Sequence, residues 1–269
     1  MNKTYQLTDL LTKTQEELAS IAQEKLTSCG YTLEIKEGKY IVGTTETENP
    51  ITLLAHLDLV NKTPPQPQDI IFESEHTTTP ERTDERTYTG AVYRLENSQA
   101  TCLGADDRNG IFAIFSLLDK GYRPYVIFTH DEEVGCVGGG QLREDLENLP
   151  QLRDILNQSA MLIQVDRGSK YHFDEVVYYN EKNEQFMDFI QDFGFTDGRK
   201  DERVTGSSTD VRVLSEILTP ATCNVSAGYV REHGENELCL WDGLTATIDK
   251  LERIMRKCQA EGLVFEKVR

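Results

Sequence analysis

Apolar residues fall along the chain in two patterns, short continuous runs and longer stretches with helical spacing. The continuous runs are typical of buried strands and are ITLLAHL at 51–57, YVIFT at 125–129 and MLIQV at 161–165. Apolar residues at every third or fourth position predict helices at 7–28, after Gly110 and at 241–258. Because strands alternate with helices, we expect an α/β fold, a three-layer α/β/α arrangement around a mostly parallel mixed sheet.

Two further regions have patterns of their own. Residues 31–45 consist of two short apolar runs around a Glu-Gly pair, which predicts a β-hairpin. Residues 61–100 are the most polar part of the chain, and we expect an excursion with edge strands near 69–73 and 87–95. The composition of its tip favours disorder over a lid above a substrate. No repeat or linker divides the sequence, which predicts a single catalytic domain over residues 1–269.

The charge balance excludes several classes of partner. Lys and Arg number 28 against 46 Asp and Glu, so the formal net charge is −18 and neither nucleic acid nor an anionic membrane is an expected partner. No apolar run is long enough to span a membrane, and the polar amino end lacks the apolar core of a signal peptide. Six cysteines are scattered without a CxxC pair, which predicts reduced thiols and a cytoplasmic protein.

Acids and histidines gather where the three predicted strands end. The first strand runs into His56 and Asp58, the second into the His-Asp-Glu-Glu sequence at 130–133, and the third into Asp166. In an open α/β sheet the functional crevice lies at the carboxyl ends of the strands. Carboxylates that converge there cannot all stay ionised without compensating cations. A pair of divalent metal ions would provide the compensation, and histidine with Asp and Glu ligands suits zinc.

Each motif also has a structural interpretation. His56 could be a buried histidine with satisfied hydrogen bonds, and the acids in LGADDRNG at 103–110 could cap a helix. The Glu-Glu pair could belong to a solvated loop, Asp166 could be a turn residue, and His233 is a lone histidine late in the chain. Taken one at a time, the motifs leave these alternatives open.

The ordered set of motifs is more specific than any member. HxD at 56–58, GADDRNG at 104–110, DEExG at 131–135, Asp166 after its strand and HGxNE at 233–237 occur in this order. This order resembles that of the co-catalytic zinc peptidases of the M20 type, and the GADDxxG and DEExG stretches are most similar to the tripeptidase T branch. The related M28 and M42 aminopeptidases use the same ligand order. The resemblance spans about residues 51–237 and implies the zinc-peptidase fold.

The resemblance also implies a role for each matching residue. It implies two zinc ions, which cobalt or manganese could replace, and a cis peptide between Asp106 and Asp107. The implied ligands are His56 and Asp166 for the first ion, Glu133 and His233 for the second, and Asp106 as the bridge between them. Asp58 would support His56, and Glu132 would be the general base that takes a proton from a water molecule between the ions.

The chain departs from this resemblance in its spacing. Asp166 and His233 are 67 positions apart, and His56 and Asp106 are 50 apart, so neither interval holds the inserted lid or dimerisation domain of larger relatives. This spacing predicts a catalytic domain without an inserted domain and favours a monomer. Tyr229 and Arg231 are candidate substitutes for groups that a lid would supply. The stretch at 206–210 resembles a small-residue loop that contacts substrate.

Three functions remain in competition. The first is a di-zinc aminopeptidase or small-peptide peptidase, with a small peptide or an amino-acid amide as substrate. The second is a deacylase of N-acyl amino acids on the same site, which would need a cationic anchor for the substrate carboxylate, for which Arg231 and Arg108 are candidates. The third is a metal-binding module without turnover. Replacing Glu132 and assaying aminoacyl against N-acyl substrates would separate them.

Overall fold

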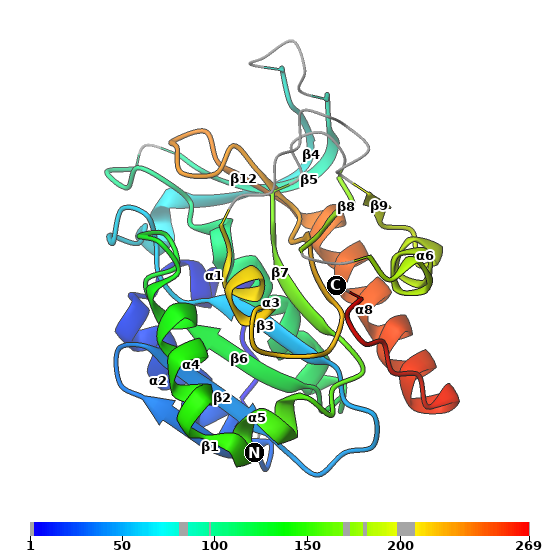
Figure 1. Ribbon diagram of the computed structural model, residues 1–269. Coiled ribbons are helices and arrows are strands. Elements are labelled where there is room, and N and C mark those ends of the chain that lie inside the picture. Colours follow the sequence, from blue (N-terminus) through cyan, green and yellow to red (C-terminus); the bar gives the residue numbers. More distant parts are fainter. Residues whose placement is uncertain are drawn as a thin grey trace.

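The centre of the fold is a mixed β-sheet, seen in a computed structural model that describes residues 3–80, 86–96, 98–168, 173–179, 182–197 and 208–268 (Figure 1). The sheet has eight strands in these ranges. In order across the sheet they are β1 (Thr32–Lys36), β2 (Tyr40–Thr44), β6 (Tyr125–Thr129), β3 (Thr52–His56), β7 (Leu162–Arg167), β10 (Thr222–Ser226), β8 (Glu175–Tyr178) and β9 (Thr196–Asp197).

The four middle strands, β6, β3, β7 and β10, are parallel to one another. The β8–β9 pair is also parallel, whereas β1–β2, β2–β6 and β10–β8 are antiparallel. The predicted apolar runs form β3, β6 and β7, which lie next to one another in the sheet. Their carboxyl ends therefore meet at one edge, where the predicted site residues follow them.

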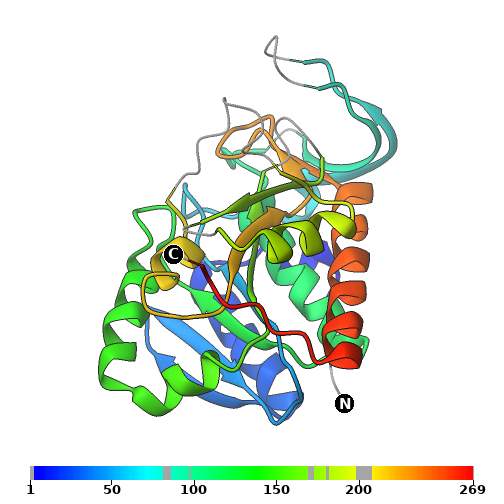
Figure 2. The same ribbon diagram turned by 45° about the vertical axis from the view of Figure 1, so that its right-hand side comes forward.

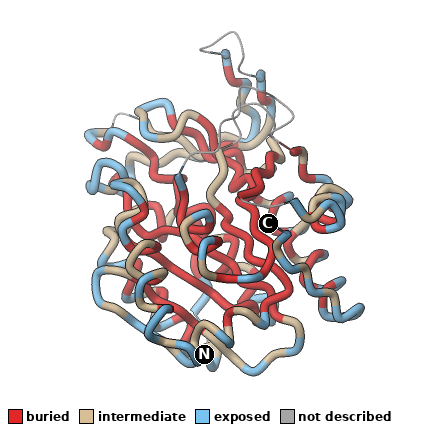
Figure 3. The backbone as a smooth tube through the Cα atoms, viewed as in Figure 1, coloured by how far each residue is buried: buried red, intermediate tan, exposed pale blue. Residues whose placement is uncertain are grey.

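Helices cover both faces of this sheet, as the three-layer prediction requires. One face packs against helices α1 (Leu7–Leu11), α2 (Gln15–Ser28), α3 (Ala105–Asp119), α6 (Glu184–Asp192) and α8 (Trp241–Glu261). The other face packs against α4 (Val137–Asn148), α5 (Pro150–Leu156) and α7 (Asp210–Leu214). Successive side chains of β3 go to opposite faces, so Leu53 joins the first apolar core and Leu54 the second. Figure 3 shows the resulting buried centre.

A second, smaller sheet lies beside the first and is wholly antiparallel. Its order is β11 (Tyr229–Val230), β12 (Leu238–Leu240), β5 (Thr89–Leu95) and β4 (Ile70–Thr77), with a 3-10 turn, η1 (Pro67–Asp69), before β4. The β4 and β5 strands confirm the strands predicted within residues 61–100, and their hairpin projects from the body of the molecule (Figures 1 and 2). The tip at 81–85 lies outside the described residues.

Some element predictions are wrong in their bounds. The single helix predicted at 7–28 is two helices, because Thr14 caps α2 in a box with Glu17, where each backbone amide donates to the other's side chain. The helix predicted after Gly110 begins at Ala105, and α5 and β12 were not predicted. Among the helices of the described residues, none combines the length and apolar character needed to cross a membrane.

Candidate metal centre

The predicted site residues come together at the carboxyl edge of the main sheet. His56 is the last residue of β3, Asp166 lies near the end of β7, and Glu133 belongs to the loop after β6. Asp106 lies at the start of α3, and His233 lies in the loop between β11 and β12. Five segments that are far apart in sequence therefore supply one site.

Asp106 divides these residues into two groups, because its two carboxylate oxygens face different histidines. Oδ1 lies 2.9 Å from His56 Nε2, and the same nitrogen lies 3.5 Å from Asp166 Oδ1. Oδ2 of Asp106 lies 3.1 Å from His233 Nε2, which lies 2.9 Å from Glu133 Oε1. The peptide between Asp106 and Asp107 is cis, as the resemblance implied.

Both groups fit the ligand set of a small divalent ion. Within each group the ligand atoms lie within 4.8 Å of one another. Ligands about 2.0–2.2 Å from one zinc ion lie about 3.3–3.6 Å apart in a tetrahedral site, and the contacts of the two histidines, at 2.9–3.5 Å, are close to this range. Glu133 Oε1 is buried without a hydrogen-bond partner among the described residues, although it faces His233 Nε2. An acceptor in this position is explained by a cation between the two side chains.

The charges of the site show why cations would stabilise it. Burial alone would lower the pKa of His56, but contacts with Asp106, Asp166 and Asp58 raise it well above its usual value. Contacts with Asp106 and Glu133 raise the pKa of His233 to about 11. Burial and neighbouring carboxylates raise the pKa of Asp166 to about 7. The acids thus retain protons or bind imidazolium ions, and metal ions would take over that compensating charge.

Asp58 joins the first group to the loop that follows β6. Its Oδ1 lies 3.2 Å from His56 Nδ1, on the side of the ring opposite the ligand nitrogen. Both carboxylate oxygens also accept backbone hydrogen bonds, from Glu132 N at 2.9 Å and from Glu133 N at 3.0 Å. Although burial opposes it, His56 and these amides lower the pKa of Asp58 to about 2. Asp58 therefore orients a predicted ligand and holds the two glutamates in place.

Glu132 lies beside the two groups without belonging to either. Its Oε1 accepts a hydrogen bond from the Cys136 thiol, with Sγ at 3.6 Å. Burial, together with the charges of Asp166, Asp210 and Asp106, raises the pKa of Glu132 to about 9. The adjacent Glu133 points to His233 instead. Geometry thus separates the two glutamates, one as part of a ligand group and one as an unattached carboxylate next to it.

Asp166 is held by Thr209, from the predicted loop at 206–210, and by two residues that the sequence analysis did not select, Gln164 and Asn224. Gln164 Nε2 and Thr209 Oγ1 donate to its Oδ2 at 2.9 and 3.2 Å, which leaves Oδ1 toward His56. Asn224 Oδ1 accepts a hydrogen bond from the Asp166 amide at 3.0 Å. The available signal was a polar residue inside an apolar strand, since Gln164 and Asn224 both interrupt buried runs.

Tyr229 is a correction to the prediction of a lid substitute. The side chain is only 2% exposed, and its hydroxyl donates to the Asp166 carbonyl at 3.0 Å. Tyr229 therefore supports the backbone of Asp166, a predicted ligand, and does not reach a substrate. Arg231 Nη2 donates to the Thr79 carbonyl at 2.5 Å, which links the loop carrying His233 to the β4–β5 hairpin.

Arg108 is also excluded as a substrate anchor. It is completely buried and donates to the backbone carbonyls of Asp58 at 2.6 Å and of Lys13 at 3.1 Å. A substrate carboxylate in the crevice could not reach the Arg108 guanidinium group unless these hydrogen bonds were broken. Arg108 instead places one positive charge beneath the acids of the site.

The loop predicted to contact substrate is only partly described. Gly206 and Ser207 lie outside the described residues, and Thr209 supports Asp166. Asp210 is 1% exposed and accepts a hydrogen bond from Thr129 Oγ1 at 2.5 Å, so it faces the interior and not a substrate. Burial raises the pKa of Asp210 to about 6.

This buried carboxyl predicts a pH-dependent stability difference. A raised native pKa means that the folded state binds the proton more tightly, so stability falls as pH rises from about 4 to about 6. Asp210→Asn keeps an acceptor for Thr129 and carries no charge. We expect the variant to exceed the wild type by about 3 kcal/mol in unfolding free energy above pH 6, with the difference vanishing near pH 4. Urea unfolding at several pH values measures it, and a pH-independent difference would contradict the assignment.

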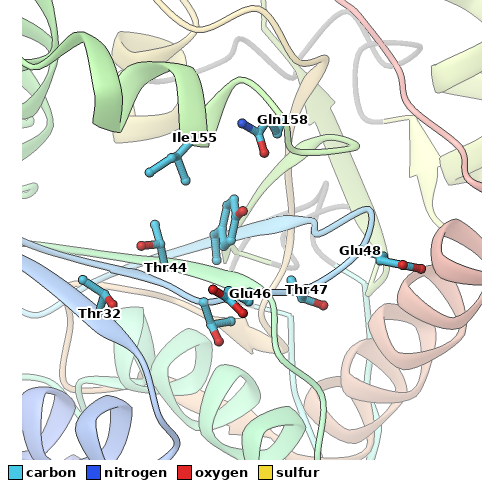
Figure 4. A pocket seen from close by; sticks show the side chains of 9 residues that line it. Thr32, Thr44, Glu46, Thr47, Glu48, Ile155 and Gln158 are labelled. Atoms are coloured by element: carbon cyan, nitrogen blue, oxygen red, sulfur yellow. The ribbon is translucent and has the colours of Figure 1, made fainter.

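Figure 4 shows a hollow of about 610 Å³ with a different set of lining residues. Its lining includes Thr32, Thr44 and Tyr125, and Tyr125 is the first residue of β6, whereas the metal groups follow the strand ends. None of the predicted site residues lines this hollow. The predicted chemistry therefore belongs to the carboxyl edge of the sheet.

Compared by sequence, the chain matches no protein-family model and no curated protein. Solved structures do share its fold. A tripeptidase from Staphylococcus aureus has a TM-score of 0.62 at 10% identity, over 95% of this chain and 97% of that chain. Aminopeptidase PepT from Bacillus cereus has a TM-score of 0.60 at 13% identity, over 93% and 96%. The TET1 peptidase of Pyrococcus horikoshii, which can assemble into a tetrahedron or an octahedral shell, has a TM-score of 0.51 at 13% identity, over 90% and 94%.

These similarities confirm the predicted α/β class and extend over nearly the whole of each chain. They include a tripeptidase, PepT and a TET peptidase, so they do not single out the M20 type from the M28 and M42 types. The chain has the fold that these peptidases share.

Proposed function

We propose that the protein is a two-zinc exopeptidase that removes amino-terminal residues from small peptides. The observation that carries the proposal is the position of Asp106, whose two oxygens face His56 and His233 in separate ligand groups. The peptidases that share the fold support a peptide substrate. The motifs GADDRNG and DEExG favour the tripeptidase T branch of the M20 type within that fold.

The chain's own residues divide the work of peptide hydrolysis. When bound, two zinc ions would polarise the scissile carbonyl and acidify an attacking water molecule. His56 and Asp166 would hold the first ion, Glu133 and His233 the second, and Asp106 both. Glu132 would take the proton from the attacking water and then donate it to the leaving nitrogen. Asp58 would keep Glu132 in reach, because it accepts a hydrogen bond from the backbone amide of that residue.

The cationic residues favour an aminopeptidase over a deacylase. A deacylase would need a positive group for the carboxylate of an N-acyl amino acid, but Arg108 is buried and Arg231 is hydrogen-bonded to the β4–β5 hairpin. An amino-terminal ammonium group, in contrast, suits a crevice rich in carboxylates. His233, with a side chain 45% exposed, marks the open side from which a substrate would enter.

Metal analysis with a peptide assay tests the proposal. We expect two zinc ions per chain and cleavage of a tripeptide with a free amino end, lost after treatment with a chelator and restored by zinc, cobalt or manganese. The matched substrate is the same tripeptide with an acetylated amino end, which should remain uncut. Preferential cleavage of N-acyl amino acids would favour the deacylase. Two bound ions without hydrolysis of either class would indicate a non-catalytic metal-binding module.

We also propose a monomer, since the sequence intervals hold no inserted dimerisation domain. The TET1 peptidase with the same fold assembles into large shells, so size is a direct test. Light scattering coupled to size-exclusion chromatography should give a mass near 30.5 kDa. A mass several times larger would contradict the monomer and indicate an assembly.

A further inference from the structure

Glu237 is a buried carboxylate that the proposed reaction does not use. It is only 1% exposed, and its two oxygens accept backbone hydrogen bonds from different amides. Oε2 accepts from Gly104 N at 2.8 Å, and Oε1 accepts from Asp106 N at 3.0 Å. Burial raises the pKa of Glu237 to about 8, and each oxygen of the side chain satisfies one backbone donor of this segment.

The two amides belong to the irregular start of α3. Gly104 has φ of +80°, and Asp106 has φ −82° and ψ 104°, which are not helical values. No local side chain caps this helix end. Glu237 thus satisfies backbone donors at a helix start from more than 130 residues away in sequence. The φ and ψ of Asp106 set the direction of its Cα–Cβ bond. The position of its carboxylate therefore depends on this non-helical backbone.

Glu237 also lies at the end of the loop that carries His233. This loop runs from β11 to β12, and both Arg231 and His233 have positive φ, 59° and 66°. Glu237 N donates to the Gly234 carbonyl at 3.1 Å, which closes the turn behind His233. One residue therefore joins the segment of Asp106 to the loop of its second histidine partner, by its side chain on one side and its backbone on the other.

We propose that Glu237 is a positioning residue that aligns Asp106 between the two ligand groups. It holds the backbone of Asp106 so that one carboxylate oxygen faces His56 and the other faces His233. The inference rests on the proposed function only in so far as the two groups bind metal ions. It predicts that loss of the Glu237 carboxylate weakens the binding of both ions, because Asp106 is the ligand that both groups share.

Zinc titration against a chromophoric chelator at fixed pH tests the inference in the full-length protein. Glu237→Gln keeps the size of the side chain, but its amide group can accept from only one of the two backbone donors. We expect a loss of about tenfold or more in zinc affinity at both sites, in line with changes to groups that orient metal ligands. Glu133→Gln, which removes a ligand of one group only, should lower the zinc affinity of that group and leave the affinity of the other unchanged. Glu235→Gln, an exposed neighbour, is the matched control and should bind zinc as the wild type does.

The outcomes separate the inference from the proposed function. A wild type that binds no zinc would overturn both. Two tightly bound ions in wild type and in Glu237→Gln alike would overturn the inference alone. A purely structural role would lower the thermal unfolding temperature of the metal-free variant while its folded fraction kept wild-type affinity. Glu237→Asp keeps the two carboxyl oxygens with a shorter reach, so we expect an intermediate affinity. Equal affinity in the Asp and Gln variants would contradict the alignment.

Discussion

Replacing Glu132 with alanine should lower kcat for a free tripeptide by about a hundredfold or more while both zinc ions remain bound. A positioned general base contributes about 10²–10⁴-fold to a rate. Glu132 belongs to neither ligand group, so its loss removes a proton acceptor without removing a ligand. The loop should keep its conformation, because Asp58 accepts hydrogen bonds from the backbone amides of residues 132 and 133, which alanine retains.

Kinetics and metal analysis on the same preparation provide the measurement. Glu132→Gln should lose a similar part of the rate, since it keeps the shape but cannot take the proton. Glu147→Ala, an exposed acid on α4, is the control and should leave kcat unchanged. A Glu132→Ala variant that retains wild-type turnover would remove Glu132 as the base, and one that loses an ion would make it a ligand.

The two neighbouring glutamates, Glu132 and Glu133, have roles that the local sequence does not predict. Consecutive residues project differently, but the sequence does not tell which of them faces a metal. The structure assigns Glu133 to the His233 group by a distance of 2.9 Å and leaves Glu132 outside both groups. The turn that produces this begins at Asp131, whose φ of 57° no local pattern foretold. The roles of the pair therefore come from the family resemblance and remain part of the proposal.

The fold was predictable where a local pattern determines the element. The apolar runs at 51–57, 125–129 and 161–165 formed neighbouring strands, because a run buried on both faces has few alternatives to a central strand. Elements held by distant partners were missed. β12 has three residues and pairs with β5, and both belong to a sheet whose two pairs of strands are more than 130 residues apart in sequence. The second sheet as a whole was not predicted for this reason.

The sequence indicated the candidate site residues as a list, and of their supports it indicated only Asp58. Acids at strand ends mark the crevice, since strand order places those ends together. Glu237 lies in the HGxNE stretch, yet its partners Gly104 and Asp106 are reached only through tertiary structure. The burial of Tyr229 and Arg108, which changed their interpretation, likewise depends on packing that composition does not encode.

Gly110→Ala should be a strongly destabilising substitution, because it affects the fold and the site together. A Cβ at this position would lie less than 3.0 Å from the Val165 carbonyl of β7 and from both carboxylate oxygens of Asp107. Backbone on one side and a buried carboxylate on the other leave no room to adjust. We expect a loss of about 3 kcal/mol or more in unfolding free energy, at or above the usual upper end for overpacking.

The same substitution should reduce zinc binding. Asp107 accepts hydrogen bonds from Gly110 N at 3.0 Å and from His56 N at 3.1 Å, so it fixes the start of α3 against the end of β3. Displacing Asp107 would shift the adjacent Asp106 and the backbone of His56, which are both predicted ligands. Urea unfolding and zinc titration measure the two effects. Gly140→Ala is the matched control, because a Cβ there meets nothing within 4 Å and alanine is the better helix former, by about 0.5–1 kcal/mol. If Gly110→Ala proved as stable as Gly140→Ala, the close contact between α3 and β7 would not be what holds Asp106 in place.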